Sequence, residues 1–154
     1  MTPAIDAARK AGIAFHIHEY QHDPSAASYG LEAAEKMGVP PEQVFKTLVA
    51  EAGIELVVAI IPVEQTLNLK KIARAAGAKK AAMAEGKKVE RSSGYVLGGV
   101  SPLGQKRALR TFVDESAAAF REIYVSAGKR GLEIQLAPQD LLKLTGGELA
   151  SLCN

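Results

Sequence analysis

The sequence has little cysteine and no long apolar run. Its only cysteine, Cys153, is the penultimate of 154 residues. One thiol excludes an intramolecular disulfide framework, which is typical of a reducing compartment, and a place beside the chain end argues against a catalytic nucleophile. No stretch approaches the roughly 18 apolar residues of a membrane-spanning helix, and the first residues lack the pattern of a signal peptide. We therefore expect a cytoplasmic protein with no membrane partner.

Acidic residues are scarce in the middle of the chain. Residues 67–110 hold 11 basic and 2 acidic side chains, although the whole chain has a net charge of only +2. Such a basic segment predicts attraction to nucleic acid, because each neutralised phosphate releases condensed counterions. The alternative is a solvated helical face that lysine keeps in solution. Four side chains are the candidates for steering a nucleic acid: Lys70, Lys71, Lys106 and Arg107.

No repeat, low-complexity tract or linker divides the chain, so we expect one domain over residues 1–154. Capping residues and apolar periodicity predict helices over residues 3–12, 31–37, 67–76 and 82–91 and from 138 onward. Apolar alternation and turn signals predict strands over residues 14–20, 44–50, 54–61, 94–97, 108–113, 122–125 and 132–136. Strands outnumber helices and several neighbours form hairpins. We therefore predict an α+β fold with a mixed, mostly antiparallel, barrel-like sheet and flanking helices.

A lysine interrupts one of the apolar strands. Lys46 shares a face of the predicted strand with Val44 and Leu48, and Thr47 points to the other face. If Val44 and Leu48 point inward, Lys46 enters a pocket, where an unpaired ammonium group needs a partner or a ligand anion. The alternative is an edge-strand lysine that reaches water. Lys46 is a candidate catalytic residue and Thr47 a candidate substrate-binding residue.

Residues 98–104 form a glycine-dense turn that leads into basic residues. Gly98 and Gly99 lack a Cβ, so a ligand can approach the main chain and their N–H groups can hold an oxyanion or a carbonyl. Gly98 is therefore a candidate catalytic residue, and Gly99 and Ser101 are candidate substrate-binding residues. The turn has neither the phosphate-loop pattern nor the dinucleotide fingerprint. The alternative is an ordinary turn between strands.

Familiar catalytic patterns are missing from the rest of the chain. His16 and His18 share a strand face, but no cysteine or suitably spaced carboxylate accompanies them, so we expect no metal site. No nucleophile elbow is present, and no Ser–His–acid triad can be assembled from the spacing. Tyr20 and Tyr29 are either walls of a pocket or ordinary half-buried rings.

Five segments, in order along the chain, carry a resemblance to a known family: Thr2-Pro3-Ala4-Ile5, Phe45-Lys46-Thr47-Leu48, Leu67-Asn68-Leu69-Lys70-Lys71, Gly98-Gly99-Val100-Ser101-Pro102-Leu103-Gly104-Gln105-Lys106 and Val125-Ser126-Ala127-Gly128-Lys129-Arg130-Gly131. They are similar in order and spacing to the YbaK/EbsC proteins of the prolyl-tRNA editing superfamily. The resemblance implies a single editing domain of mixed, barrel-like α/β fold. Its pocket would hold the aminoacylated 3′ end of tRNA.

The resemblance also implies roles for particular residues. Lys46 corresponds to the pocket lysine, and the backbone of Gly98 corresponds to a substrate contact. The other implied substrate-binding residues are Tyr20, Tyr29, Ser126 and Glu133. Two positions depart from the family pattern. Ala127 replaces a commoner glycine, which disfavours a positive φ, and Glu133 replaces a commoner aspartate, which changes the reach of its carboxylate into the pocket.

The activity implied by the resemblance is removal of cysteine from mischarged Cys-tRNA(Pro), in trans beside prolyl-tRNA synthetase. The thiol of the substrate would attack its own ester carbonyl, so no metal, cofactor or enzyme nucleophile is expected. Alanine and serine lack that thiol, which would provide the discrimination. Two alternatives stay open: a deacylase for another misacylated tRNA, such as Ala-tRNA(Pro), and a non-catalytic module that binds tRNA or a synthetase.

Overall fold

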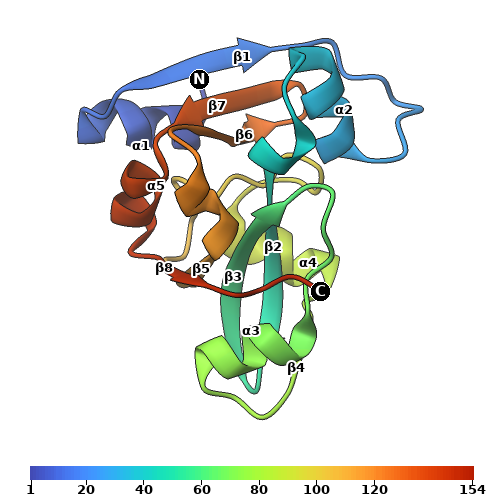
Figure 1. Ribbon diagram of the computed structural model, residues 1–154, viewed down its shortest axis with the longest axis vertical. Coiled ribbons are helices and arrows are strands. Elements are labelled where there is room, and N and C mark those ends of the chain that lie inside the picture. The colour runs from blue at the N-terminus through green and yellow to red at the C-terminus, as the bar shows by residue number, and fades with distance from the viewer.

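The computed structural model describes the whole chain, from Met1 to Asn154 (Figure 1). Its helices are α1 (Pro3–Ala11), α2 (Tyr29–Met37), α3 (Leu69–Ala76), α4 (Gly86–Ser93) and α5 (Pro138–Thr145), with 3₁₀ turns η1 (Pro41–Gln43) and η2 (Glu115–Ala119). Its strands are β1 (Phe15–Glu19), β2 (Phe45–Ala52), β3 (Glu55–Pro62), β4 (Ala81–Met83), β5 (Arg110–Asp114), β6 (Ile123–Lys129), β7 (Leu132–Leu136) and β8 (Glu148–Ala150).

The strands form two sheets. One has the order β1-β7-β6 and is antiparallel, and the other has the order β4-β2-β3-β5-β8. In the larger sheet β3 pairs with β5 and β5 with β8 in parallel, whereas β2 pairs antiparallel with β3 and β4. The mixed, mostly antiparallel arrangement is therefore confirmed. The sheets do not close into a barrel, and a bridge between Val44 and Tyr124 connects them.

The larger sheet is buried on both faces. On one face Val49 and Val58 join the main core cluster, to which α4 contributes Val89. On the other face lies a second cluster, to which α3 contributes Ile72 and the C-terminal segment contributes Leu152. Helices α3 and α4 therefore cover opposite faces of the sheet, as Figure 1 shows by drawing α3 in front of β2 and α4 behind it.

Helix boundaries follow the capping signals of the sequence. Helix α1 begins after Thr2, whose Oγ1 accepts the N–H of Ile5 at 3.2 Å, and it ends at Gly12, which has φ 70°. A residue at a left-handed C-cap must adopt a positive φ, which glycine does without steric cost. None of the helices combines the length and apolar character needed to cross a membrane.

Two predicted elements are wrong, and two strands, β4 and β8, are absent from the prediction. Residues 94–97 form bends and turns and not a strand, and the predicted helix over 82–91 is the end of strand β4 followed by α4. Gly86 is the first residue of α4 and does not interrupt it. Both β4 and β8 have three residues and lie at the edges of the larger sheet, so their conformation depends on pairing partners that no local pattern reveals.

Candidate functional site

A cavity of about 510 Å³ lies where α2, β2, α4 and the β6–β7 hairpin meet. Most of the sequence-predicted pocket residues line it: Tyr20, Tyr29, Lys46, Thr47, Gly98, Ser126 and Glu133. Apolar neighbours from β2, α4 and the turn before Gly98 complete the wall. The volume is in the range of small-molecule sites. No histidine or cysteine lines it.

The open edge of β2 forms one wall of this cavity. Strand β2 pairs with β3 over its whole length but with β4 only from Ala50 to Ala52. The carbonyl of Val49 accepts the N–H of Ala84 at 3.0 Å, so the backbone groups of Val49 point toward the β4 side. Because this direction alternates along an antiparallel strand, the N–H and C=O of Thr47 also point to that side, beyond the end of β4. They are available to an extended ligand.

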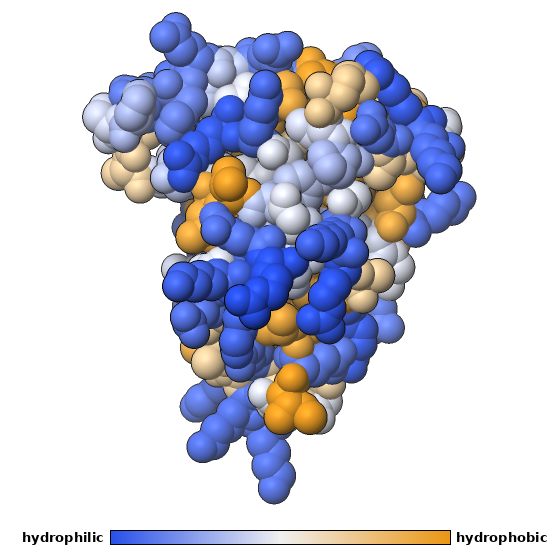
Figure 2. Space-filling model, turned by 180° about the vertical axis from the view of Figure 1, so that it is seen from behind, coloured by the Kyte–Doolittle hydropathy of each residue, from blue (hydrophilic) through white to orange (hydrophobic).

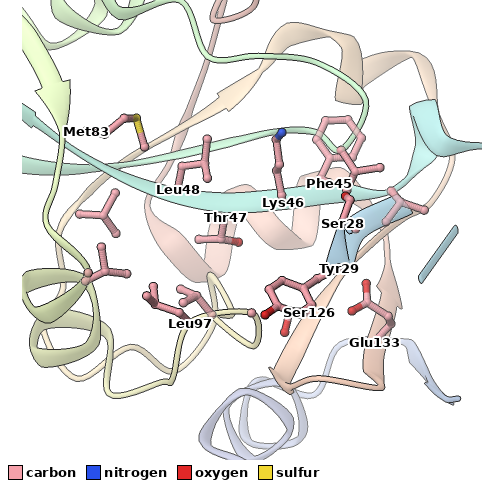
Figure 3. Close-up of a pocket in the computed structure, with 18 of the residues that line it drawn as sticks. Ser28, Tyr29, Phe45, Lys46, Thr47, Leu48, Met83, Leu97, Ser126 and Glu133 are labelled. Carbon is pink, nitrogen blue, oxygen red and sulfur yellow. The ribbon is translucent and has the colours of Figure 1, made fainter. Parts of the chain in front are cut away.

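Side chains from both faces of β2 reach the cavity around this edge. Figure 3 shows Thr47 projecting from the side of β2 on which Tyr29, Ser126 and Glu133 lie, and Lys46 projecting from the other side. The structure thus brings these residues to one cavity without placing the ammonium group of Lys46 beside the carboxyl group of Glu133. The predicted alternation of Lys46 and Thr47 is confirmed.

Three polar side chains that line the cavity lack a hydrogen-bond or ion-pair partner within the protein. The Oγ1 atom of Thr47 is buried without a hydrogen-bond partner. Lys46 and Glu133 take part in none of the ion pairs of the structure. Desolvation of such groups costs free energy that a bound ligand can return. This concentration of unpaired polar groups is what a binding site requires and what a stable core avoids.

Burial changes the acidity of the charged groups here. Glu133 is 7% exposed, and burial raises its pKa from 4.5 to about 8. Burial, together with the smaller effects of the carboxylates of Glu133 and Glu32, raises the pKa of Tyr20 to about 12. Burial lowers the pKa of Lys46, with a smaller opposing effect from Cys153. Because burial and the neighbouring Asp114 raise the pKa of Cys153 to about 11, that thiol is neutral at pH 7 and is no counterion for Lys46.

At Gly98, the absence of a Cβ makes room for neighbouring side chains and not for a ligand. It has φ +89°, and a Cβ at this position would lie 2.9 Å from Cε2 of Tyr29 and 3.1 Å from Cζ of Arg130. Neighbouring side chains, and not a cavity for ligand, therefore occupy the space that the missing Cβ leaves. Glycine is required here both by the backbone conformation and by the close packing of Tyr29 and Arg130.

We expect Gly98→Ala to destabilise the fold by about 2–3 kcal/mol, because it adds steric overlap to the cost of a positive φ. Gly12→Ala is the matched control, since Gly12 has φ +70° and nothing within 4 Å of its Cβ position. The control should lose only about 1 kcal/mol. Urea unfolding of both variants measures the difference. Equal losses would show that packing against Tyr29 and Arg130 contributes nothing.

Two residues expected to bind substrate do not line the cavity. The N–H of Gly99 is donated to the carbonyl of Val96 at 3.0 Å, and a Cβ there would lie 2.7 Å from the Cα of Lys129. Ser101 is completely buried, and its Oγ accepts the N–H of Leu103 at 3.2 Å. Both residues stabilise the turn, which folds against the β6–β7 hairpin. Their placement corrects the roles expected from the sequence.

The two departures from the family pattern are accommodated by the β6–β7 hairpin. A bulge between Ser126 and Lys129 includes Ala127, and no residue other than glycine has a positive φ. Gly128, with φ 113°, takes the unusual conformation instead. Ala127 is therefore not strained. The side chain of Glu133 is one methylene longer than that of the commoner aspartate, and its carboxyl group also reaches the cavity.

Glu32 holds the loop between β1 and α2 against the cavity. Its Oε1 lies 2.7 Å from Nδ1 of His22, and its Oε2 accepts the N–H of Asp23 at 2.6 Å and lies 3.3 Å from Nζ of Lys36. Burial acts to raise the pKa of Glu32, but these hydrogen bonds more than offset burial and the pKa is lowered. The sequence analysis missed this residue because His22 and Asp23 lie in a polar loop with no periodicity.

The predicted basic residues lie on two faces of the molecule. Lys70 and Lys71 are on α3, and the Nζ of Lys71 donates to the carbonyl of Cys153 at 2.7 Å. Lys106 and Arg107 are exposed and bonded through their backbone N–H groups to the end of α4, on the opposite face of the sheet. Figure 2 shows the back of the molecule as mainly hydrophilic. A single bound surface therefore does not span all four residues.

The strand histidines have structural contacts. Nε2 of His18 lies 2.7 Å from Oε1 of Gln135, and its ring meets that of Tyr124 edge-on, with 5.5 Å between the centroids. His16 is exposed. No three histidine, cysteine or acidic side chains are grouped as metal ligands.

Comparison with known proteins identifies the fold and the family. The family model of the aminoacyl-tRNA editing domain matches residues 23–144. The chain belongs to this family. The editing domain is 45% identical, over 120 residues, to a protein of Enterococcus faecalis named "Putative Cys-tRNA(Pro)/Cys-tRNA(Cys) deacylase EbsC". These residues are 77% of this chain and 73% of the relative.

Solved structures share the fold of the editing domain along the whole chain. A protein described as "a putative trans-editing enzyme for prolyl tRNA synthetase" is 25% identical, has a TM-score of 0.81 and is covered over 99% of its length by 100% of this chain. Hypothetical protein APE2540 is 21% identical with a TM-score of 0.88, and covers 99% of this chain with 100% of its own. The latter likeness concerns the fold alone. The family predicted from sequence motifs is thus confirmed.

Proposed function

We propose that this editing domain is a trans-acting deacylase that releases tRNA from mischarged Cys-tRNA(Pro). The observation that carries the proposal is the cavity at the open edge of β2, where Lys46, Thr47 and Glu133 present polar groups without partners. An aminoacyl-adenosine end supplies an ammonium group, a carbonyl, hydroxyls and a phosphate, which together satisfy such groups. The name of the 45% identical relative supports the choice of cysteine.

The cavity wall suggests how the substrate is held. The N–H of Thr47 faces the ester carbonyl, as in the pairing of two strands. Lys46 is half-buried and has no counterion, so it binds a phosphate or a hydroxyl of the terminal nucleotide and stabilises developing negative charge. Glu133 is protonated at neutral pH because of its raised pKa. Its carboxyl group therefore donates a hydrogen bond to an ester oxygen.

The substrate provides the nucleophile in this mechanism. The cysteine sulfur attacks the carbonyl carbon of its own ester, and the bond between that carbon and the 3′ oxygen of the ribose breaks. The thiol proton ends on the leaving oxygen, so the products are tRNA and a cyclic thioester, and atoms balance without an oxidant or reductant. The absence of histidine and cysteine from the cavity wall fits a site that orients the reactants and does not attack them.

Selectivity for the tRNA and cellular context form the second half of the proposal. The basic residues around α4 attract the acceptor end, and prolyl-tRNA synthetase supplies the preference for tRNA(Pro) by presenting mischarged product in the cytoplasm. The structural neighbour described as a trans-editing enzyme for prolyl tRNA synthetase supports this partner. Ala-tRNA(Pro) deacylation and a non-catalytic tRNA-binding module are the competing functions.

A panel of charged tRNAs tests the proposal. We expect the purified protein to deacylate Cys-tRNA(Pro) at least about 100-fold faster than Ser-tRNA(Pro) or Ala-tRNA(Pro), because only cysteine brings a thiol. Each reaction is followed with and without prolyl-tRNA synthetase. Equal rates for cysteine and alanine would refute the thiol mechanism and favour the alanine deacylase. Salt-sensitive tRNA binding without turnover would favour the binding module.

A further inference from the structure

Three segments far apart in the sequence meet at the mouth of the cavity. They are the start of α2 with Tyr29, the turn over residues 94–98 with Leu97, and the β6–β7 turn with Arg130. The guanidinium carbon of Arg130 lies 4.6 Å from the centroid of the Tyr29 ring. Its Nη2 donates to the carbonyl of Leu97 at 2.7 Å. Arg130 thus contacts both Tyr29 and Leu97, two residues from separate segments that line the cavity.

The backbone of Leu97 is held from both directions. Its carbonyl accepts from Arg130, and its N–H is donated to Oε2 of Glu90 on α4 at 3.0 Å. Tyr95 anchors the start of this turn in the core, but the side chains nearer the cavity contribute little packing, since Val96 is 61% exposed and Leu97 44% exposed. These two hydrogen bonds therefore fix the position of Leu97 at the mouth of the cavity.

The guanidinium group of Arg130 is engaged on several sides. One N–H group is bonded to Leu97, one face covers the ring of Tyr29, and the edge near Cζ fills the space above Gly98. A guanidinium that binds a phosphate presents a free fork of two parallel N–H groups. The contacts of Arg130 thus favour a role within the wall over direct binding of tRNA phosphate.

We propose that Arg130 is a positioning residue that sets the width of the cavity mouth by fixing Leu97 and Tyr29. The proposal rests on the proposed function for the identity of the substrate, but the contacts themselves belong to the free protein. Loss of Arg130 releases Leu97 and the ring of Tyr29, while Tyr95 still anchors the start of the turn, so the aminoacyl group enters a wider and less ordered mouth. Binding of the substrate then weakens, whereas the groups at the open edge of β2 are unchanged.

Lys129 offers a matched control. It is the preceding residue, it is exposed, and it forms none of the ion pairs of the structure. Only its backbone packs against the glycine turn. Lys129→Gln and Arg130→Gln each remove one positive charge from the same turn, and only the second removes the contacts to Leu97 and Tyr29.

The kinetic test compares the three full-length variants Arg130→Gln, Arg130→Lys and Lys129→Gln on Cys-tRNA(Pro). We expect Arg130→Gln to raise KM about tenfold or more with kcat within about threefold, because it removes binding that ground and transition states share. Arg130→Lys keeps a donor and a charge and should restore part of the loss. Lys129→Gln should change KM by less than about threefold. The slope of log KM against log salt concentration should be the same for both glutamine variants.

A second measurement needs no enzymatic activity. Hydrogen exchange of the Leu97 amide in the free protein should be about tenfold faster in Arg130→Gln than in the wild type, and unchanged in Lys129→Gln. If the wild type has no deacylase activity but this exchange result holds, the proposed function fails and the positioning role stands. Equal exchange and equal KM in the two glutamine variants would overturn the positioning role. A salt slope reduced by about 1 only in Arg130→Gln would show a direct phosphate contact instead.

Discussion

Lys46→Met is expected to reduce kcat/KM for Cys-tRNA(Pro) about 100-fold or more, the loss typical of removing one preorganised electrostatic contact to a transition state. The same substitution should leave the free energy of unfolding equal to that of the wild type or higher. The reason is that Lys46 is a half-buried ammonium group without an ion pair, and burial already lowers its pKa. Methionine keeps the aliphatic stem and removes the desolvated charge.

Deacylation assays and urea unfolding of the same preparation measure both effects. Lys143→Met on α5 is the control for the loss of one positive charge, because Lys143 is exposed and lies outside the cavity. Unchanged activity of Lys46→Met would remove this residue from the mechanism. Lower stability together with lower activity would show that Lys46 is a structural residue whose partner the free protein already provides.

Glu133→Gln is expected to stabilise the protein at alkaline pH. Because burial raises the pKa of Glu133 from 4.5 to about 8, the folded protein binds this proton more tightly than the unfolded chain does. The stability that the proton provides is complete below pH 4.5 and is lost as the pH rises to about 8. Glutamine has no proton to lose. The variant should therefore exceed the wild type at pH 9 by an amount with an upper limit of about 5 kcal/mol.

The activity of this variant should change in a different way. Wild-type kcat/KM should fall above pH 8 as Glu133 loses the proton that it donates to the substrate. The amide that Glu133→Gln introduces keeps its N–H groups at every pH, so the falling limb should disappear after subtraction of the spontaneous hydrolysis of the ester. Glu19→Gln, at an exposed position of β1, is the control for both experiments. A falling limb that persists in Glu133→Gln would assign it to another group.

Much of the fold could be predicted from the sequence, because the relevant signals are local. Thr2 and Gly12 bracket α1, and the alternation around Lys46 predicts the correct faces of β2. The turn at residues 94–97 resembles a strand in the sequence because Tyr95, Val96 and Leu97 have strand-like side chains. In the structure Tyr95 is buried and its hydroxyl donates to the carbonyl of Leu103 at 2.6 Å, a contact that tertiary packing imposes.

The pocket residues were found by a different kind of signal. The polar character of Lys46 within an apolar strand is visible in one sequence, and family motifs added Glu133 and Ser126. Gly99 and Ser101 misled the sequence analysis, since a glycine-dense turn is equally suited to holding a ligand and to packing against a hairpin. Only the contact with Lys129 and the buried hydroxyl of Ser101 distinguish the two uses.

The sequence by itself determined the α+β class, the helix ends, the family and the residues whose chemistry is unusual for their surroundings. These properties depend on side-chain type and on neighbours within a few residues. Three features were decided by the tertiary structure alone. Strand β4 ends at Met83 and leaves the edge of β2 open, and helices α3 and α4 carry their basic residues on opposite faces of the larger sheet. Arg130 connects Leu97 to Tyr29. Each of these depends on contacts between segments distant in the chain, and such contacts leave no periodic trace in the sequence.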